Sequence, residues 1–195
     1  MHSKKYLVFK NSLETVSLDR YPADLRHEEC KRWDYSPELP AVSVVLVFHN
    51  EGWATLVRTI HSVINFTPKE LLEEVVLIDD GRKRIKIDIF DRNIYGLFSF
   101  SIFLNLFNSI ESVKEHLVKG GRLEEHIKQF NGLVKLYHND RREGLIRARS
   151  IGARRSVGSV LVYLDAHCEV EPNWLPPLIQ PMVHGNLVPL LYILP

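Results

Sequence analysis

Four runs of apolar residues, each followed by polar residues, divide the chain. They span residues 42–48, 75–78, 133–137 and 160–164, and most of their members are β-branched or aromatic. Nearly continuous apolar runs of this length are typical of strands that are buried on both faces of a parallel sheet. The pattern predicts four strands, and we expect 160–164 to be a central strand around which the rest is organised.

Helical periodicity separates these runs. Apolar residues recur at three-to-four spacing over 53–64, and Pro68 stops the pattern. A second helix is predicted after Gly144 through Ala153, and residues 111–130 indicate a helix with an interruption at two glycines. A strand, helix and strand within about 40 residues form a βαβ unit with a right-handed crossover. The fold class is therefore predicted to be α/β with a mostly parallel sheet.

Length and composition are those of one globular domain. The chain has 195 residues, of which 45% are hydrophobic and 25% charged, with a net charge of +1. A balanced charge gives no overall attraction to nucleic acid, so we expect no nucleic-acid partner. The cysteines, Cys30 and Cys168, permit one disulfide but form no framework. The N-terminus has too few consecutive apolar residues for a signal peptide.

Three segments depart from the α/β pattern. Residues 1–40 are polar and predict a lead-in segment wrapped over the domain. Residues 81–110 begin with basic side chains and continue into an uncharged aromatic stretch. Its serines and asparagines favour a buried helix or a poorly packed insertion over a membrane span. After Trp174, which we expect in the core, the chain is rich in proline and ends in apolar residues.

Polar residues that follow the strands are candidates for chemistry. Asp165 and His167 come after the fourth run, and a carboxylate with an imidazole suits a cation such as Mn²⁺. The alternative is a cap on a helix that begins at Glu171. In open α/β sheets, ligands bind at the carboxyl ends of the strands. Several polar clusters at that edge therefore predict one site.

Three further clusters would share this edge. Either Asp79 or Asp80 would point into the crevice and accept a hydrogen bond from a base or a ribose, unless the pair only forms a turn or a helix cap. His49 would contact a nucleotide, or it is a satisfied polar residue. Arg141 and Arg142, with the free backbone donors of a helix start, would hold a diphosphate, or they form a solvated surface.

In their order along the chain, these motifs resemble the polypeptide N-acetylgalactosaminyltransferases. The resemblance covers about residues 15–80 and 111–186 and rests on the segments 45–51, 58–64, 79–80, 141–149 and 164–169. It implies a Rossmann-like nucleotide-sugar-binding domain of the GT-A type. Enzymes of this family transfer N-acetylgalactosamine from UDP-GalNAc to Ser or Thr of proteins, in mucin-type O-glycosylation. They use Mn²⁺, retain the anomeric configuration and act in the Golgi lumen.

The resemblance also implies roles for individual residues. Asp165 and His167 would be the metal ligands at the catalytic centre, with Ala166 near the sugar nucleotide. A metal ion on the diphosphate would neutralise the UDP leaving group, so that a sugar cation can develop and be captured by the acceptor hydroxyl on the same face.

Four more residues would bind the donor, according to the same resemblance. Asp80 would hold the uracil, and Arg142 would bind the substrate. Val47 and His49 would form the wall of the uridine pocket.

The resemblance predicts that only part of the family pattern is present. We expect a lead-in segment at 1–40, a donor-binding domain at 41–186 with an atypical insertion at 81–110, and an unrelated tail at 187–195. In the family, a membrane anchor precedes this region. A further metal-binding His, an acceptor-binding half and a lectin domain follow it. The chain is thus expected to be a truncated or alternatively spliced form, with the partner of Cys30 missing.

Three hypotheses follow. The chain is a glycosyltransferase by descent, whose own turnover is not predicted because the metal shell is incomplete. Alternatively, it is a non-catalytic UDP-binding or interaction protein of the same fold. The third hypothesis is a product that does not fold stably, because of its apolar insertion.

Overall fold

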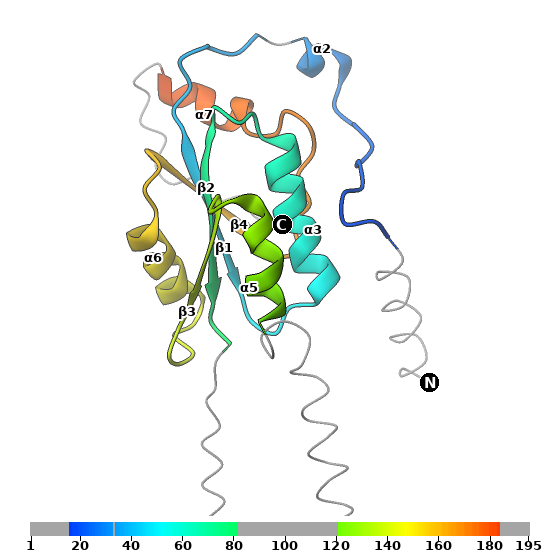
Figure 1. The fold of residues 1–195 in the computed structure, drawn as a ribbon. Helices are drawn as coiled ribbons and strands as arrows, with labels where there is room; N and C mark the ends of the chain where they lie inside the picture. Colours follow the sequence, from blue (N-terminus) through cyan, green and yellow to red (C-terminus); the bar gives the residue numbers. More distant parts are fainter. Residues whose placement is uncertain (1–15, 33, 82–120, 184–195) are drawn as a thin grey trace, which may run out of the picture.

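A parallel four-stranded sheet forms the centre of the protein (Figure 1). The computed structural model describes residues 16–32, 34–81 and 121–183. The strand order is β3-β2-β1-β4, with the strands β1 (Val42–Phe48), β2 (Leu72–Asp79), β3 (Val134–His138) and β4 (Val160–Asp165). The predicted α/β class, with a parallel sheet, is confirmed.

Helices cover both faces of this sheet. Figure 1 shows α6 on one face and α3, α5 and α7 on the other. The bounds are α2 (Glu28–Lys31), α3 (Trp53–Phe66), α5 (Arg122–Ile127), which continues into the 3-10 helix η1 (Lys128–Phe130), α6 (Leu145–Arg155) and α7 (Pro176–Val183).

The core has a larger and a smaller part, which lie on opposite faces of the sheet. Alternate residues of β1 face α3 and α6, so that Leu46 packs in the larger cluster and Val45 in the smaller one. The helix α6 lies very close to β1 at Gly152, where an added Cβ atom would be 2.4 Å from Val45 Cγ1. Only glycine permits this distance, so Gly152 fixes how closely α6 packs on the sheet.

The strand β4 does not have the predicted central position. Among the described strands it lies at an edge of the sheet, beside β1, while β1 and β2 are central. Its residues Val162 and Leu164 are nevertheless buried, with exposed fractions of 1% and 4%. An apolar run indicates that both faces of a strand are buried under helices. It does not indicate whether the strand has a hydrogen-bonded neighbour on one side or on both.

The strand β2 begins earlier than its apolar run. It starts at Leu72 and includes Glu74, whose side chain is only 1% exposed. Glu74 accepts hydrogen bonds from Ser43 Oγ at 2.8 Å and Val157 N at 2.7 Å. Lys135 Nζ lies 2.6 Å from its other oxygen. A buried charge needs such partners. Because Glu74 is charged, the apolar run in the sequence begins only after it and misses the start of the strand.

The lead-in residues from 16 to 32 run beside α3 (Figure 1). Tyr21 packs edge to face on Phe66, with 5.1 Å between ring centroids. Cys30 and Cys168 are both free. No helix in the described ranges is long and apolar enough to cross a bilayer. The predicted insertion after Gly81 and the predicted tail at 187–195 lie outside the described residues, so their bounds stay predictions.

We expect Glu74→Gln to lower the free energy of unfolding at neutral pH by about 1–3 kcal/mol, because it removes a charged partner of Lys135. Burial raises the pKa of the Glu74 carboxyl, but Lys135, the Val157 amide and Ser43 outweigh burial and hold the pKa below 4.5. The folded pKa is thus below the unfolded one. The stabilisation is present above about pH 4.5 and is lost as the pH falls through the folded pKa.

Urea unfolding at neutral pH and at about pH 3 measures this effect. The difference between wild type and Glu74→Gln should shrink in acid, whereas Glu73→Gln, at the exposed neighbouring position, should change little at either pH. A difference that is equally large at both pH values would contradict the assignment.

Candidate functional site

The carboxyl ends of the strands meet at one edge of the sheet. Val47 is the register partner of Asp165 on β4 and of Ile78 on β2. One residue further, Asp79 pairs with Phe48 of β1 and with His138 of β3. The register therefore confirms the predicted convergence of polar clusters at this edge.

Asp165 and His167 are accessible at this edge. The Asp165 side chain is 27% exposed and accepts a hydrogen bond from Arg149 Nη2 at 3.2 Å through Oδ1. The His167 side chain is 54% exposed, and its Nδ1 lies 3.9 Å from Glu51 Oε1. Ala166, between them, is buried. The next helix begins only at Pro176, so the alternative of a cap on a helix starting at Glu171 is wrong.

The donor atoms of Asp165 and His167 suit a divalent cation. A carboxylate oxygen and an imidazole nitrogen are ligands that Mn²⁺ accepts, and Asp165 Oδ2 makes no hydrogen bond to a described residue. Within the described ranges, no group of three His, Cys, Asp or Glu side chains is arranged to hold a metal ion. These two side chains therefore fit as part of a ligand shell, which needs further ligands.

Asp80 holds the loop before α6. The residue is 3% exposed, and its Oδ1 accepts hydrogen bonds from Asn139 Nδ2 at 2.7 Å and Glu143 N at 2.8 Å. Its Oδ2 accepts a hydrogen bond from Gly144 N at 2.9 Å. Gly144 has a φ of +84°, a left-handed conformation that favours glycine.

The backbone N–H groups of Glu143 and Gly144, which precede α6, both donate to Asp80. The predicted binding of a diphosphate at the start of this helix stays a prediction. Arg141 Nε lies 2.6 Å from Glu143 Oε1, although the Arg141 side chain is 78% exposed, and Arg142 is exposed as well. Arg142 makes no hydrogen bond or ion pair with a residue that the structure describes.

Asp79 faces a different set of partners. Its Oδ1 accepts a hydrogen bond from Gly81 N at 2.9 Å, and its Oδ2 lies 2.9 Å from His138 Nδ1. The other nitrogen of His138 lies 3.1 Å from Glu124 Oε1. Neither His138 nor Glu124 was among the residues predicted for the site. His138 follows an apolar run directly and was recognisable by that position, but nothing in the sequence connects Glu124 on α5 to this edge.

His49 and Val47 lie at the end of β1. His49 is half-buried, and its Nδ1 is buried without a hydrogen-bond partner in the described part of the chain. Val47 is half-buried against the α6 side of the core. Both positions are compatible with the predicted uridine wall. Trp174 packs on the core and donates from Nε1 to Thr67 Oγ1 at 3.0 Å, which confirms its predicted core position.

We expect Asp80→Asn to release the loop before α6. In Asn, an NH₂ group that can only donate replaces one carboxylate oxygen, so one of the two backbone N–H groups loses its acceptor. The free energy of unfolding should therefore fall by about 2–3 kcal/mol. Hydrogen exchange at Glu143 and Gly144 should become faster. Asp140→Asn, at an exposed position of the same loop, is the control. Unchanged exchange at both amides in Asp80→Asn would contradict this role.

Comparison with known proteins agrees with this geometry. The family model described as glycosyl transferase family 2 matches residues 43–91 and 121–191. N-acetylgalactosaminyltransferase 7 of Homo sapiens is 50% identical over 170 residues, which are 87% of this chain and 21% of that protein. The enzyme of the same name from Drosophila melanogaster is 41% identical over 175 residues, which are 90% of this chain and 24% of that protein.

A solved structure has the same fold. The crystal structure of GalNAc-T7 with UDP, GalNAc and Mn²⁺ superposes with a TM-score of 0.68 and 48% sequence identity, over 87% of this chain and 26% of that one. The chain thus spans about a fifth to a quarter of the length of these relatives. It belongs to glycosyl transferase family 2 and, within it, to the polypeptide N-acetylgalactosaminyltransferase family that its motifs indicated.

Proposed function

We propose that this chain binds the sugar donor of a retaining polypeptide N-acetylgalactosaminyltransferase, UDP-GalNAc, together with Mn²⁺. One observation supports the proposal most directly. Asp165 and His167 lie accessible at the carboxyl edge of the sheet, in a chain that is 48% identical to a structure solved with UDP, GalNAc and Mn²⁺. The two proposed metal ligands therefore lie at the edge of the sheet where open α/β folds bind their ligands.

Different residues of this chain would bind different parts of the donor. Asp165 and His167 would bind the metal ion, which neutralises charge on the diphosphate when bound. Arg142 is exposed and would contact the phosphates or the sugar. Val47 and His49 would line the uridine pocket at the end of β1.

Asp80 is proposed to contact the uracil while it holds its loop. A carboxylate oxygen has about two acceptor sites, and Oδ1 uses both, for Asn139 and Glu143. Oδ2 accepts only from Gly144 and therefore keeps one site, which an N–H group of the base would occupy.

Transfer to Ser or Thr of acceptor polypeptides, in the Golgi lumen, is proposed for the whole enzyme of this family. A second candidate is donor binding without turnover by this chain. This second candidate is favoured because the described ranges supply only part of a metal shell, with no group of three His, Cys, Asp or Glu side chains placed to bind one ion. A catalytic site would need the remaining ligands and the acceptor groups to be supplied from elsewhere.

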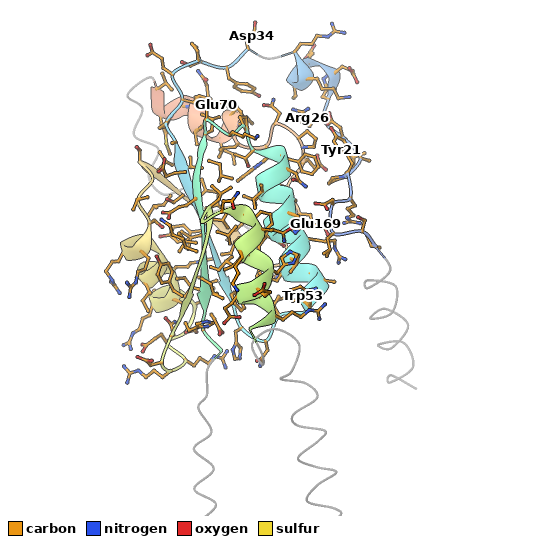
Figure 2. The ribbon with its side chains drawn as sticks, viewed as in Figure 1. Tyr21, Arg26, Asp34, Trp53, Glu70 and Glu169 are labelled. Atoms are coloured by element: carbon orange, nitrogen blue, oxygen red, sulfur yellow. The ribbon has the colours of Figure 1, made fainter. Side chains whose placement is uncertain are left out.

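Calorimetric titration of UDP, with and without Mn²⁺, tests donor binding. We expect Mn²⁺ to raise the affinity of the wild-type chain for UDP by about tenfold or more, and Asp165→Ala to remove this gain. The control Asp34→Ala, at an exposed position on the lead-in segment, should keep it (Figure 2). A folded wild-type chain with no Mn²⁺-dependent affinity would contradict the proposal. Retention of the gain in Asp165→Ala would contradict the metal assignment.

A further inference from the structure

Buried polar residues of α3 hold the loop that carries His167. This loop, residues 166–170, follows β4 directly. Ser62 Oγ accepts a hydrogen bond from Val170 N at 3.1 Å and donates to Thr59 O at 2.9 Å. Thr59 Oγ1 lies 3.0 Å from Ala166 O and 3.1 Å from Thr55 O, so its proton is shared by two carbonyl groups. Both ends of the loop are thereby joined to one helix.

An ion pair joins the middle of the same loop to α3. Arg58 Nε donates to Glu169 Oε1 at 3.1 Å, and the Arg58 side chain is only 4% exposed. The other oxygen of Glu169 accepts from Arg20 of the lead-in segment. Figure 2 shows Glu169 beside α3, on the side of the helix where the lead-in segment runs.

These polar groups are costly to bury in a helix that otherwise packs on the core. Arg58, Thr59 and Ser62 have exposed fractions of 3%, 0% and 5%. Buried polar groups are tolerated where they are paired, and a buried charge requires a charged partner. Here many of the partners belong to the loop. The helix α3 therefore presents two kinds of contact, apolar ones to the sheet and polar ones to residues 166–170.

His167 depends on these contacts for its direction. Its side chain is 54% exposed, and the nearby carboxylate of Glu51 is 3.9 Å away, which is longer than a hydrogen bond. The backbone on both sides is fixed instead, at Ala166 and at Val170. The N–H of Cys168 also donates to Asp165 O at 3.2 Å and closes the turn. An exposed ligand side chain on a fixed backbone is pre-organised for binding, because less freedom is lost when it binds.

We propose that Arg58, Thr59 and Ser62 are positioning residues of the donor site. They fix the backbone of 166–170 and so set the direction in which His167 presents its ligand atom, next to the end of β4 that carries Asp165. This inference rests on the proposed function, since it assigns these ligands to a metal ion. Outer contacts of metal ligands typically change metal affinity by about 10–100-fold when they are removed.

The test uses two variants that remove a hydroxyl group. Ser62→Ala removes the acceptor for Val170 N, and Thr59→Val removes the donor to Ala166 O while keeping the shape of the side chain. Thr59→Ser keeps the hydroxyl group and serves as the conservative variant. Ser150→Ala is the matched control, because Ser150 donates to Ile146 O on the exposed side of α6. Hydrogen exchange and UDP titration are measured for each full chain.

The first readout needs no ligand. Amide exchange of Val170 should become faster in Ser62→Ala, and exchange over 166–170 should rise in Thr59→Val. Thr59→Ser and Ser150→Ala should resemble the wild type. Unchanged exchange over 166–170 in both hydroxyl-removing variants would overturn the positioning role, whatever the wild type binds.

The second readout is the ratio of UDP affinities with and without Mn²⁺. We expect this ratio to fall about tenfold in Ser62→Ala and Thr59→Val, with little change in metal-free affinity. An equal loss of both affinities would overturn the proposal, because a merely structural role lowers the binding-competent fraction for both. A wild type without any Mn²⁺-dependent gain would contradict the proposed function, and the exchange results would still decide whether α3 holds the loop.

Discussion

Parallel pairing of β1 with β2 on one side and β4 on the other is the constraint on which the site depends. Parallel strands end at the same edge of a sheet, so the residues after each strand meet there without any further requirement. The register places Asp165 beside Val47, and Asp79 beside His138 one residue further. Apolar contacts on both faces keep this register, because a slip by one residue would turn each core side chain to the other face.

Loops at the two edges of the sheet are held by hydrogen bonds from their backbone to buried side chains of the neighbouring strands and helices. At the amino edge, Glu74 accepts from the amide of Val157, and Ser43 accepts from the amide of Gly158. At the carboxyl edge, Asp80 holds the loop before α6, and Ser62 of α3 holds the loop after β4. Loops lack the regular backbone pairing of helices and strands. A polar side chain from a rigid element supplies the missing partner.

Hydrophobic periodicity was sufficient to predict the strands, α3 and α6, because each buries a face with a regular spacing. It did not predict that β4 lies at an edge, since pairing is a property of the backbone. It also predicted α3 at the correct place. Arg58, however, entered the sequence analysis only as part of the segment 58–64 that carries the family resemblance. The link from Arg58 to Glu169 spans 111 positions, and no local pattern encodes it. His138 and Glu124 meet for the same reason, through the packing of α5 on β3.

Two accessible ligand side chains have a consequence for how the proposed site would bind. A cation such as Mn²⁺ takes more ligands than Asp165 and His167 supply, so phosphate oxygens of the nucleotide would complete part of its shell. Metal and nucleotide would then stabilise each other, and the factor by which one raises the affinity for the other must be the same in both directions. Weak binding of either alone is therefore consistent with strong binding of both. The loop at 166–170, held by α3, would set how large this coupling is, because it carries His167 and adjoins Asp165.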